Sequence, residues 1–380
     1  MVDENKPKIM VKAFLDEPTE QVLQRLAEEN SFDAISVTPL ERYGFGGAKL
    51  YKGFFTKDMT GIPFVVKINN DKKIQKEVAA LLSVRTNFKT CLISSAFKPG
   101  YIGKHGAVIY ELITSEKNKT LELKEWIIND KIPGYQVAEK LLELYERIYP
   151  DAHRAGKPTG IVFSKEYQKV DKDYLRNGLA RSRIELVFGD KSGEPKLIVL
   201  GTEIPNPLLI LNEGFKNEVY CYAGPVHGDL HSSNVMLGNK KEPNLIDFAW
   251  ADPTGHLLKD FVLMENSLRF MLFPEYIPPD DQLKVDQALL EEEGFNKIKE
   301  IDFSNASSKE LFCRLSESIG VIRVAAKRCT YSGDFNEYLA SQFLILYGLL
   351  SYKEYHFFPA LRALGLIGSK LLGSDYVPTL

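Results

Sequence analysis

The pattern of apolar and polar positions changes character along the chain. Up to residue 113, short apolar runs bounded by turn-forming residues predict a five-stranded sheet with two helices. The expected elements are, in order, a helix at 11–30, two strands within 34–55, a strand at 63–69, a helix at 71–85, and strands at 91–96 and 106–113. From residue 114 onward, apolar residues recur mainly at helical spacing. This change predicts a small N-terminal lobe, 1–113, followed by a larger helical lobe, 114–380.

The second lobe is expected to be mostly helical, with a separable section at 155–225. The expected helices lie at 123–129, 135–153, 171–188, 258–273, 281–294, 307–329, 334–355 and 358–372. The helix at 171–188 is rich in basic residues, which either face solvent or contact an anionic substrate. The most apolar window, 343–350, is too short to span a bilayer and predicts a buried core helix.

Between these helices lies a stretch, Val226–Asp260, whose polar residues suit a metal site. Two short apolar runs, 234–237 and 244–247, predict strands joined by a polar turn. A hairpin of this kind holds Asp229, before its first strand, near Asp247, at the end of its second. Carboxylates and an amide gathered there suit Mg²⁺, which prefers oxygen ligands and completes its shell with water and phosphate.

Lys67 is a lysine within the apolar run of the strand at 63–69. An unpaired lysine at a buried strand position is costly, so an anionic partner is expected. Glu77, on the helix that follows, is the candidate, and a lysine–glutamate pair in this order holds nucleotide phosphates in protein kinases. The alternative is that Lys67 extends to solvent from an edge strand and that Glu77 is simply solvated.

Two further segments of the first lobe suit a nucleotide. Gly44, Gly46 and Gly47 form a turn between strands, where backbone N–H groups can approach a phosphate, although a tight hairpin alone explains the same glycines. The spacing is neither that of a Rossmann motif nor that of a P-loop. Glu111 and Ile113 stand at the end of the lobe, where a hinge exposes backbone groups to an adenine ring.

Composition describes an ordinary globular chain. The 380 residues are 44% hydrophobic and 26% charged, with a net charge of −3, which gives no support for a nucleic-acid or membrane partner. The four cysteines are scattered without a CxxC pair, which favours a reducing, cytoplasmic compartment. The polar N-terminal segment is not a signal peptide.

The motif His227-Gly-Asp-Leu-His-Ser-Ser-Asn234, followed by Ile246-Asp-Phe248, gives the chain a resemblance to a known group. Together with Lys67, Glu77 and the glycine turn, it resembles the aminoglycoside phosphotransferase and choline kinase group of the protein-kinase-like superfamily. The resemblance implies an α+β, bilobal protein-kinase-like fold. It has a small antiparallel-sheet lobe with one key helix, and a mostly helical lobe that carries the catalytic loop.

The resemblance also implies a role for each matching residue. Asp229 is the expected catalytic residue, which orients the acceptor hydroxyl and takes its proton. Asn234 and Asp247 are expected to hold Mg²⁺ at the phosphates of ATP, and Lys67 to contact those phosphates. The implied support comes from His227 beneath the catalytic loop and from Asp260, which accepts backbone N–H bonds. His231 has either a structural role or a contact with the substrate.

The expected activity is transfer of the γ-phosphate of ATP to a hydroxyl of a small molecule. Asp260 follows Asp247 by only thirteen positions, and a protein kinase needs an activation segment about twice that long. Two alternatives remain: a catalytically weak, nucleotide-binding regulatory module and an atypical protein kinase. A cationic acceptor calls for acids or aromatic rings, and the candidates are Asp252, Glu265, 291–293 and Trp250. The sequence does not indicate an oligomeric state.

Overall fold

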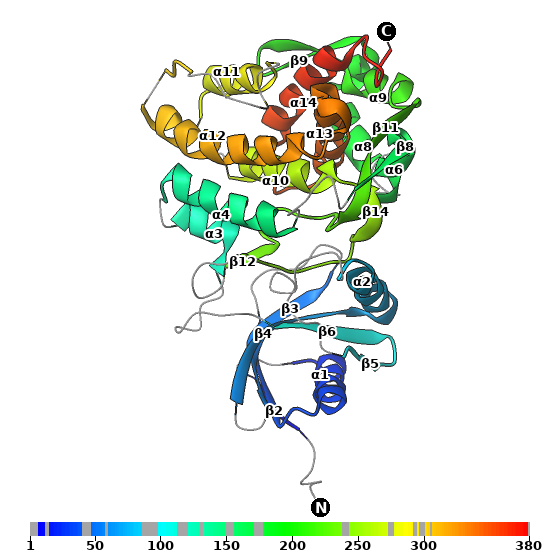
Figure 1. Ribbon diagram of the computed structural model, residues 1–380, viewed down its shortest axis with the longest axis vertical. Coiled ribbons are helices and arrows are strands. Elements are labelled where there is room, and N and C mark those ends of the chain that lie inside the picture. The colour runs from blue at the N-terminus through cyan, green and yellow to red at the C-terminus, as the bar shows by residue number, and fades with distance from the viewer. Residues whose placement is uncertain are drawn as a thin grey trace, which may run out of the picture. The chain divides into compact units, whose positions relative to one another are not determined.

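The computed structural model divides the chain into two compact units (Figure 1). Unit 1 comprises Met1–Leu123 with Ser233–Asp252, and unit 2 comprises Lys124–Ser232 with Pro253–Leu380. The residues described are 7–11, 15–39, 47–57, 60–85, 98–111, 121–129, 132–148, 156–170, 178–237, 243–272, 277–291, 295, 301–304 and 306–378. The polypeptide therefore leaves unit 1 after Leu123, returns to it at Ser233 for the hairpin that follows the HGD motif, and leaves it again after Asp252.

A six-stranded sheet forms the described framework of unit 1, in the order β1-β2-β3-β4-β6-β5. The strands are β1 (Lys8–Val11), β2 (Ala34–Pro39), β3 (Lys49–Lys57), β4 (Thr60–Asn70), β5 (Gly100–Ile102) and β6 (His105–Glu111). β1 pairs with β2 in parallel, and the other pairs are antiparallel. The predicted strand at 91–96 lies outside the described residues.

Helix α1 (Glu17–Asn30) begins later than the predicted helix at 11–30. Asp16 accepts a hydrogen bond from the backbone N–H of Thr19 and so caps the helix, and Pro18 suits its first turn. Val11 instead belongs to β1, which a polar N-terminal sequence gave no reason to expect. The prediction was therefore wrong at the helix start, because the capping residue decides where the helix begins.

Strand β4 separates two environments by the alternation of its side chains. Phe64, Val66 and Ile68 belong to the apolar core that α1 shares with the sheet. Val65 and Lys67 alternate with them and therefore face the other side. There Val65 packs against Met236, from the segment that follows the HGD motif. Lys67 forms an ion pair with Glu77 of helix α2 (Asp71–Val84). One strand thus stabilises the lobe with one face and presents the candidate site with the other.

The hairpin after the HGD motif belongs to unit 1. Its strands β12 (Val235–Leu237) and β13 (Pro243–Leu245) pair antiparallel, and β12 also pairs with β7 (Leu121–Glu122). The two predicted strands are confirmed, with shorter bounds. The pairing with β7 explains why this hairpin lies in unit 1.

The described part of unit 2 is mostly helical, and its strands form two small sheets. Its helices are α3 (Leu123–Asn129), α4 (Gly134–Ile148), α6 (Phe163–Val170), α8 (Leu179–Phe188), α9 (Pro207–Glu213), α10 (Leu258–Met271), α11 (Pro279–Leu289), α12 (Ala306–Lys327), α13 (Phe335–Leu349) and α14 (Phe357–Leu371). One sheet has the order β14-β11-β8, built from Asp252–His256, Glu218–Val226 and Lys157–Val162; the other pairs β9 (Lys196–Val199) with β10 (Thr202–Pro205). Of the predicted helix at 171–188, residues 171–177 lie outside the described residues. Gly178, with a φ of 72°, is not helical, so the prediction was wrong there, and α8 begins at Leu179.

A buried ion network holds the centre of unit 2. Glu265 of α10 accepts hydrogen bonds from Arg323 of α12 at 2.8 and 2.9 Å and from Tyr338 of α13 at 2.6 Å. Burial alone would raise the pKa of Glu265, but the charge of Arg323 holds it at about 2. Glu265 was a candidate for binding a cationic acceptor, and that prediction was wrong because its carboxylate is fully used inside the core.

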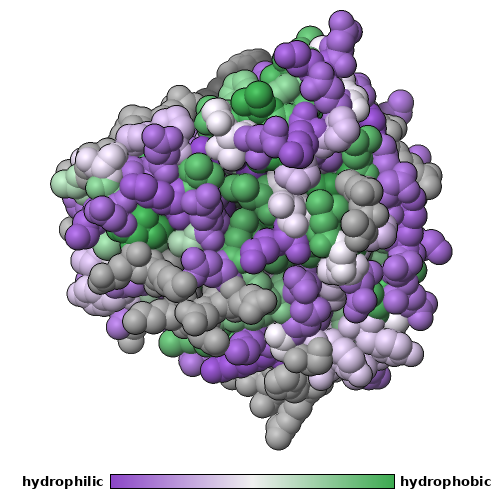
Figure 2. Space-filling model, turned by 90° about the horizontal axis from the view of Figure 1, so that it is seen from above, coloured by the Kyte–Doolittle hydropathy of each residue, from purple (hydrophilic) through white to green (hydrophobic). Residues whose placement is uncertain are grey.

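The predicted α+β class is confirmed, with a key helix and a sheet that is antiparallel except for the β1–β2 pair in unit 1, and a mostly helical unit 2. The predicted number of five strands was wrong, because the described sheet has six and includes β1 and β5, which were not expected. The apolar window 343–350 lies in and directly after α13, where nearly every side chain is buried. Among the described residues, no helix is both long and apolar enough to cross a membrane. Hydrophilic side chains cover much of the face shown in Figure 2, with hydrophobic ones in smaller areas between them.

Candidate functional site

Lys67 of β4 lies at the centre of a buried group of charges in unit 1. Its Nζ atom is 2.9 Å from Oε2 of Glu77 and 2.7 Å from Oδ1 of Asp247. The side chains of Lys67 and Glu77 are 7% and 2% exposed, whereas that of Asp247 is 27% exposed. The lysine therefore joins a strand, a helix and the hairpin, and only the hairpin carboxylate is open to solvent.

Glu77 is held in place from a second direction. The hydroxyl of Tyr110, on β6, donates a hydrogen bond to Oε1 of Glu77. Burial raises the pKa of Glu77, and the like charge of Asp247 adds to this effect, while Lys67 opposes it. For Lys67, burial alone would lower the pKa, but the two carboxylates raise it, so the lysine is charged. Both oxygens of Glu77 thus have donors, which fixes the position of Lys67.

The hairpin sets Asn234 beside Asp247. Val235 pairs with Leu245, so Asn234 and Ile246 lie at the same end of the hairpin. The backbone N–H of Ile246 donates a hydrogen bond to the Asn234 carbonyl oxygen at 3.1 Å. Asp247 has a φ of 64°, a conformation that aspartate tolerates better than most residues and that is frequent at functional sites. The Asp247 carboxylate and the Asn234 amide, at the same end of the hairpin, carry the oxygen ligand types that Mg²⁺ prefers.

In unit 2, Asp260 organises the start of the HGD motif. Its carboxylate accepts hydrogen bonds from the backbone N–H of His227 at 2.7 Å and of Gly228 at 2.8 Å. Gly228 has a φ of 79°, which favours glycine at this turn. Asp260 lies in the first turn of α10. Its side chain therefore anchors the backbone of the loop to this helix.

Asp229 follows on this loop with a partly exposed side chain. Its backbone N–H donates to Nδ1 of His227 at 3.3 Å, and Nε2 of His231 lies 3.8 Å from its Oδ2. Farther along, the N–H of Ser232 donates to the hydroxyl of Ser267 at 3.1 Å. The loop is thus fixed at several points, while the Asp229 carboxylate, 26% exposed, is accessible to a ligand.

The structure brings four of the predicted residues together in unit 1: Lys67, Glu77, Asn234 and Asp247. Three further predicted residues, Asp229, His227 and Asp260, lie together in unit 2. The chain passes from one group to the other between Ser232 and Ser233.

Of the remaining predictions, Gly44, Gly46 and Ile113 lie outside the described residues. Gly47 is described, with a φ of 78°, just before β3. Glu111 ends β6, where its backbone pairs with that of Phe64.

Sequence reasoning missed Tyr110 as part of this group. The residue ends an apolar strand run, so its ring looks like ordinary core, and its hydroxyl needs a partner when buried. Pairing Val65 with Tyr110 in the sheet is what carries its side chain to Glu77. The only signal in the sequence was a tyrosine within an otherwise aliphatic strand.

Comparison with known proteins gives one family match and several structural neighbours. Residues 174–348 match a family described as Ternary complex associated domain 9 (TCAD9). No curated protein matches the chain.

Solved structures with a similar course of the chain include phosphotransferases. A thermostable mutant of aminoglycoside phosphotransferase APH(4)-Ia, in ternary complex with ADP and hygromycin B, is 11% identical over 92% of this chain and 98% of its own, with a TM-score of 0.43. An aminoglycoside-3'-phosphotransferase of type VIII is 14% identical over 82% and 99%, with a TM-score of 0.37. A Plasmodium vivax ethanolamine kinase is 11% identical over 89% and 82%, with a TM-score of 0.31.

Proposed function

We propose that the protein is a phosphotransferase that moves the γ-phosphate of ATP, with Mg²⁺, to a hydroxyl of a small molecule. One observation carries the proposal: Lys67 is buried between Glu77 and Asp247, with Asn234 adjacent on the hairpin. A buried lysine that bridges a helix carboxylate and a more exposed carboxylate suits phosphate binding in a kinase-like site. The bilobal protein-kinase-like architecture is part of the same proposal.

Unit 1 also offers an apolar surface for the base of a nucleotide. Val65 and Met236 are buried together, with Leu50 and Ile246 partly buried against them. Val65 and Lys67 lie on the same face of β4, two residues apart, so this cluster adjoins the phosphate-binding lysine. We assign the cluster to the adenine ring and Lys67 to the phosphates.

Each polar group then has a defined task. Glu77, held by Tyr110, positions Lys67. Asn234 and Asp247 would hold Mg²⁺, which neutralises the charge of the phosphates. Asp229 orients the acceptor hydroxyl and accepts its proton, while His227 and Asp260 keep the loop in shape.

A small acceptor is favoured over a protein acceptor. The segment between Asp247 and Asp260 contains strand β14, which is a member of the β14-β11-β8 sheet, and then the first residues of α10. This leaves little chain for the long activation segment with which a protein kinase docks a polypeptide.

The experiment is Mg²⁺-dependent ATP consumption across a library of hydroxylated metabolites, with wild type, Asp229→Asn and Asp247→Ala. We expect Asp229→Asn to bind ATP normally and to lose at least about a hundredfold in turnover. Asp247→Ala should lose Mg²⁺-dependent nucleotide binding. Equal consumption by wild type and Asp229→Asn with every acceptor contradicts the enzymatic proposal. Nucleotide binding without turnover in any pool would favour the regulatory alternative.

A further inference from the structure

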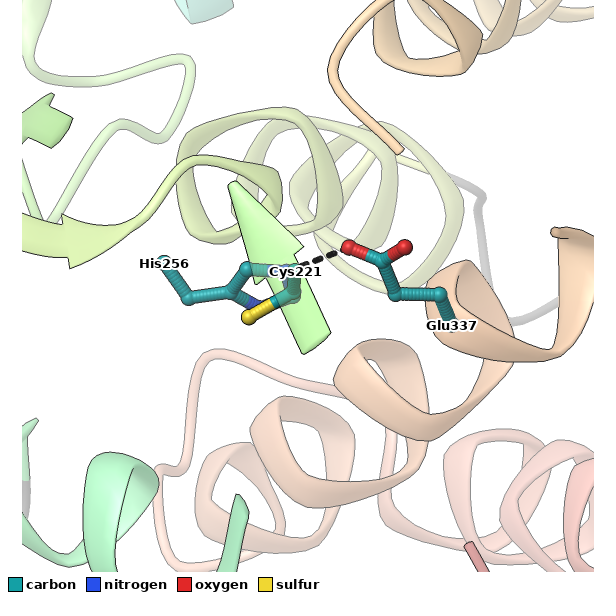
Figure 3. Close-up of side chains that lie close together, drawn as sticks. All are labelled: Cys221, His256 and Glu337. Atoms are coloured by element: carbon teal, nitrogen blue, oxygen red, sulfur yellow. Dashed lines mark hydrogen bonds and ion pairs between the residues drawn. The ribbon is translucent and has the colours of Figure 1, made fainter. Parts of the chain in front are cut away.

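A second cluster of reactive side chains lies in unit 2 and has no part in the proposed phosphotransfer. Cys221 of β11, His256 of β14 and Glu337 of α13 point toward one another (Figure 3). One donor atom from each residue lies within 4.8 Å of the other two, and all three residues are fully buried. A thiol, an imidazole and a carboxylate are the ligand types of protein zinc sites.

The surrounding contacts orient two of these residues as outer partners orient metal ligands. The Nδ1 atom of His256 is 2.8 Å from the hydroxyl of Tyr167, which leaves Nε2 directed at Glu337, 2.8 Å away. On the other side, Oε2 of Glu337 accepts the N–H of Tyr331 at 2.7 Å, so Oε1 is the oxygen turned to the cluster. Partners of this kind fix the ring and the carboxylate around a metal.

The charges of the cluster also suit a divalent cation. Glu166 and Lys259 form an ion pair at 2.5 Å next to it, and these two charges cancel. The buried Glu337 carboxylate and the Cys221 thiol offer anionic ligand atoms to a cation. A divalent ion with one thiolate and one carboxylate is neutral, so it satisfies the buried site without any further charge.

Cys221 distinguishes the metal site from a simple hydrogen-bond network. Its Sγ atom reaches the carbonyl oxygen of Thr159 at 3.9 Å, a long contact for a thiol donor. A hydrogen-bond network of Tyr167, His256 and Glu337 is complete without the thiol, whereas a thiolate is a common zinc ligand. Thr159 and Glu166, which contact Cys221 and His256, also line a groove of about 470 Å³.

We propose that Cys221, His256 and Glu337 bind one Zn²⁺ ion that ties β11, β14 and α13 together. Binding forms Zn–S, Zn–N and Zn–O bonds to the protein, and a water molecule takes the fourth position. The thiol proton passes to solvent, and no group is oxidised. Ligand atoms around tetrahedral zinc are about 3.3–3.8 Å apart, as follows from bond lengths of about 2.0–2.3 Å. The present separations, 2.8 Å between Nε2 of His256 and Oε1 of Glu337 and at most 4.8 Å to the sulfur, therefore need only local adjustment.

The test uses the full chain, without a histidine tag, produced in medium that contains zinc or cobalt. We expect about one zinc ion per chain after purification, and a thiolate-to-cobalt charge-transfer band in the near ultraviolet for the cobalt form. Cys221→Ala should lose this band. Cys329→Ala, which removes an equally buried cysteine outside the cluster, should keep it. Asp247→Ala should also keep it, because the proposed magnesium site contains no sulfur ligand.

Wild-type protein with less than about a tenth of a zinc ion per chain and no cobalt–thiolate band overturns the proposal, whatever the variants do. So does a band of full strength in Cys221→Ala. Neither result bears on ATP consumption, so the zinc site and the phosphotransferase activity are tested separately.

Discussion

Replacing Lys67 with methionine tests the buried charge group directly. The substitution keeps the length and apolar stem of the side chain but leaves Glu77 buried, 2% exposed, next to the like charge of Asp247. Removing one partner of a buried ion pair costs about 3–5 kcal/mol, because the other charge is left uncompensated. We therefore expect Lys67→Met to lower the free energy of unfolding of unit 1 by about this amount at neutral pH.

The loss should depend on pH in a defined direction. The folded-state pKa of Glu77 is already raised by burial, and losing Lys67 raises it further. A group with a raised folded pKa favours the folded state when it is protonated, below its unfolded pKa, and this advantage is lost as the pH rises through the folded value. The deficit of Lys67→Met should therefore shrink as the pH falls toward 4 and be largest above neutrality.

The assay is urea unfolding, which gives the free energy of unfolding of each variant. Hydrogen exchange of the β4 and α2 amides reports on unit 1 separately, and Glu77→Gln completes a double-mutant cycle. The double variant should be more stable than Lys67→Met alone, with a coupling energy above about 1 kcal/mol. Lys49→Met is the matched control: its ion pair with Asp16 is 45% and 50% exposed, so it should cost less than about 1 kcal/mol. A cost of Lys67→Met no greater than that of the control would refute the argument.

Three other consequences can be measured. Gly53→Ala should destabilise unit 1 by roughly 3 kcal/mol, because its Cβ would lie 1.8 Å from the Ser36 carbonyl oxygen. The control, Gly61→Ala, places its Cβ where no atom lies within 4 Å and should be nearly neutral. Equal urea midpoints for the two variants would contradict this. Glu265 has a lowered folded pKa of about 2, so its stabilisation is present above its unfolded pKa of 4.5 and is lost as the pH falls toward 2. The stabilisation amounts to roughly 3 kcal/mol. In Glu265→Gln, the thermal midpoint should therefore fall less steeply with decreasing pH below 4.5 than in the wild type. An unchanged pH dependence of the midpoint would count against the assignment. Asp260→Ala leaves the N–H groups of His227 and Gly228 without their acceptor and should cost about 2–5 kcal/mol of stability. Asp260→Asn should have a stability between those of the wild type and Asp260→Ala. Protection of the His227 and Gly228 amides against hydrogen exchange should fall in the same order.

The sequence alone determined the secondary structure where the apolar period is long or the turn chemistry is strong. The helices α12 and α14 and the strand that carries Lys67 were predicted within a few residues, because hydrophobic periodicity directly reflects burial. The start of α13 was predicted equally well, but the helix ends at Leu349, six residues before the predicted end. The HGD motif and its companions could also be named in advance, since their offsets are local. Where local signals compete, the prediction failed, as at the start of α1, where Asp16 caps the helix later than the apolar period suggests.

Only the tertiary structure decided which charges are used inside the protein and which face a ligand. Glu265 and Asp247 are both acids in mixed surroundings, yet one is closed within a core ion network and the other is partly open beside Lys67. Likewise Cys221, His256 and Glu337 are separated by 35 and 81 positions along the chain, and no spacing predicts their meeting. Burial and partner choice depend on long-range packing, which the strand and helix periods do not encode.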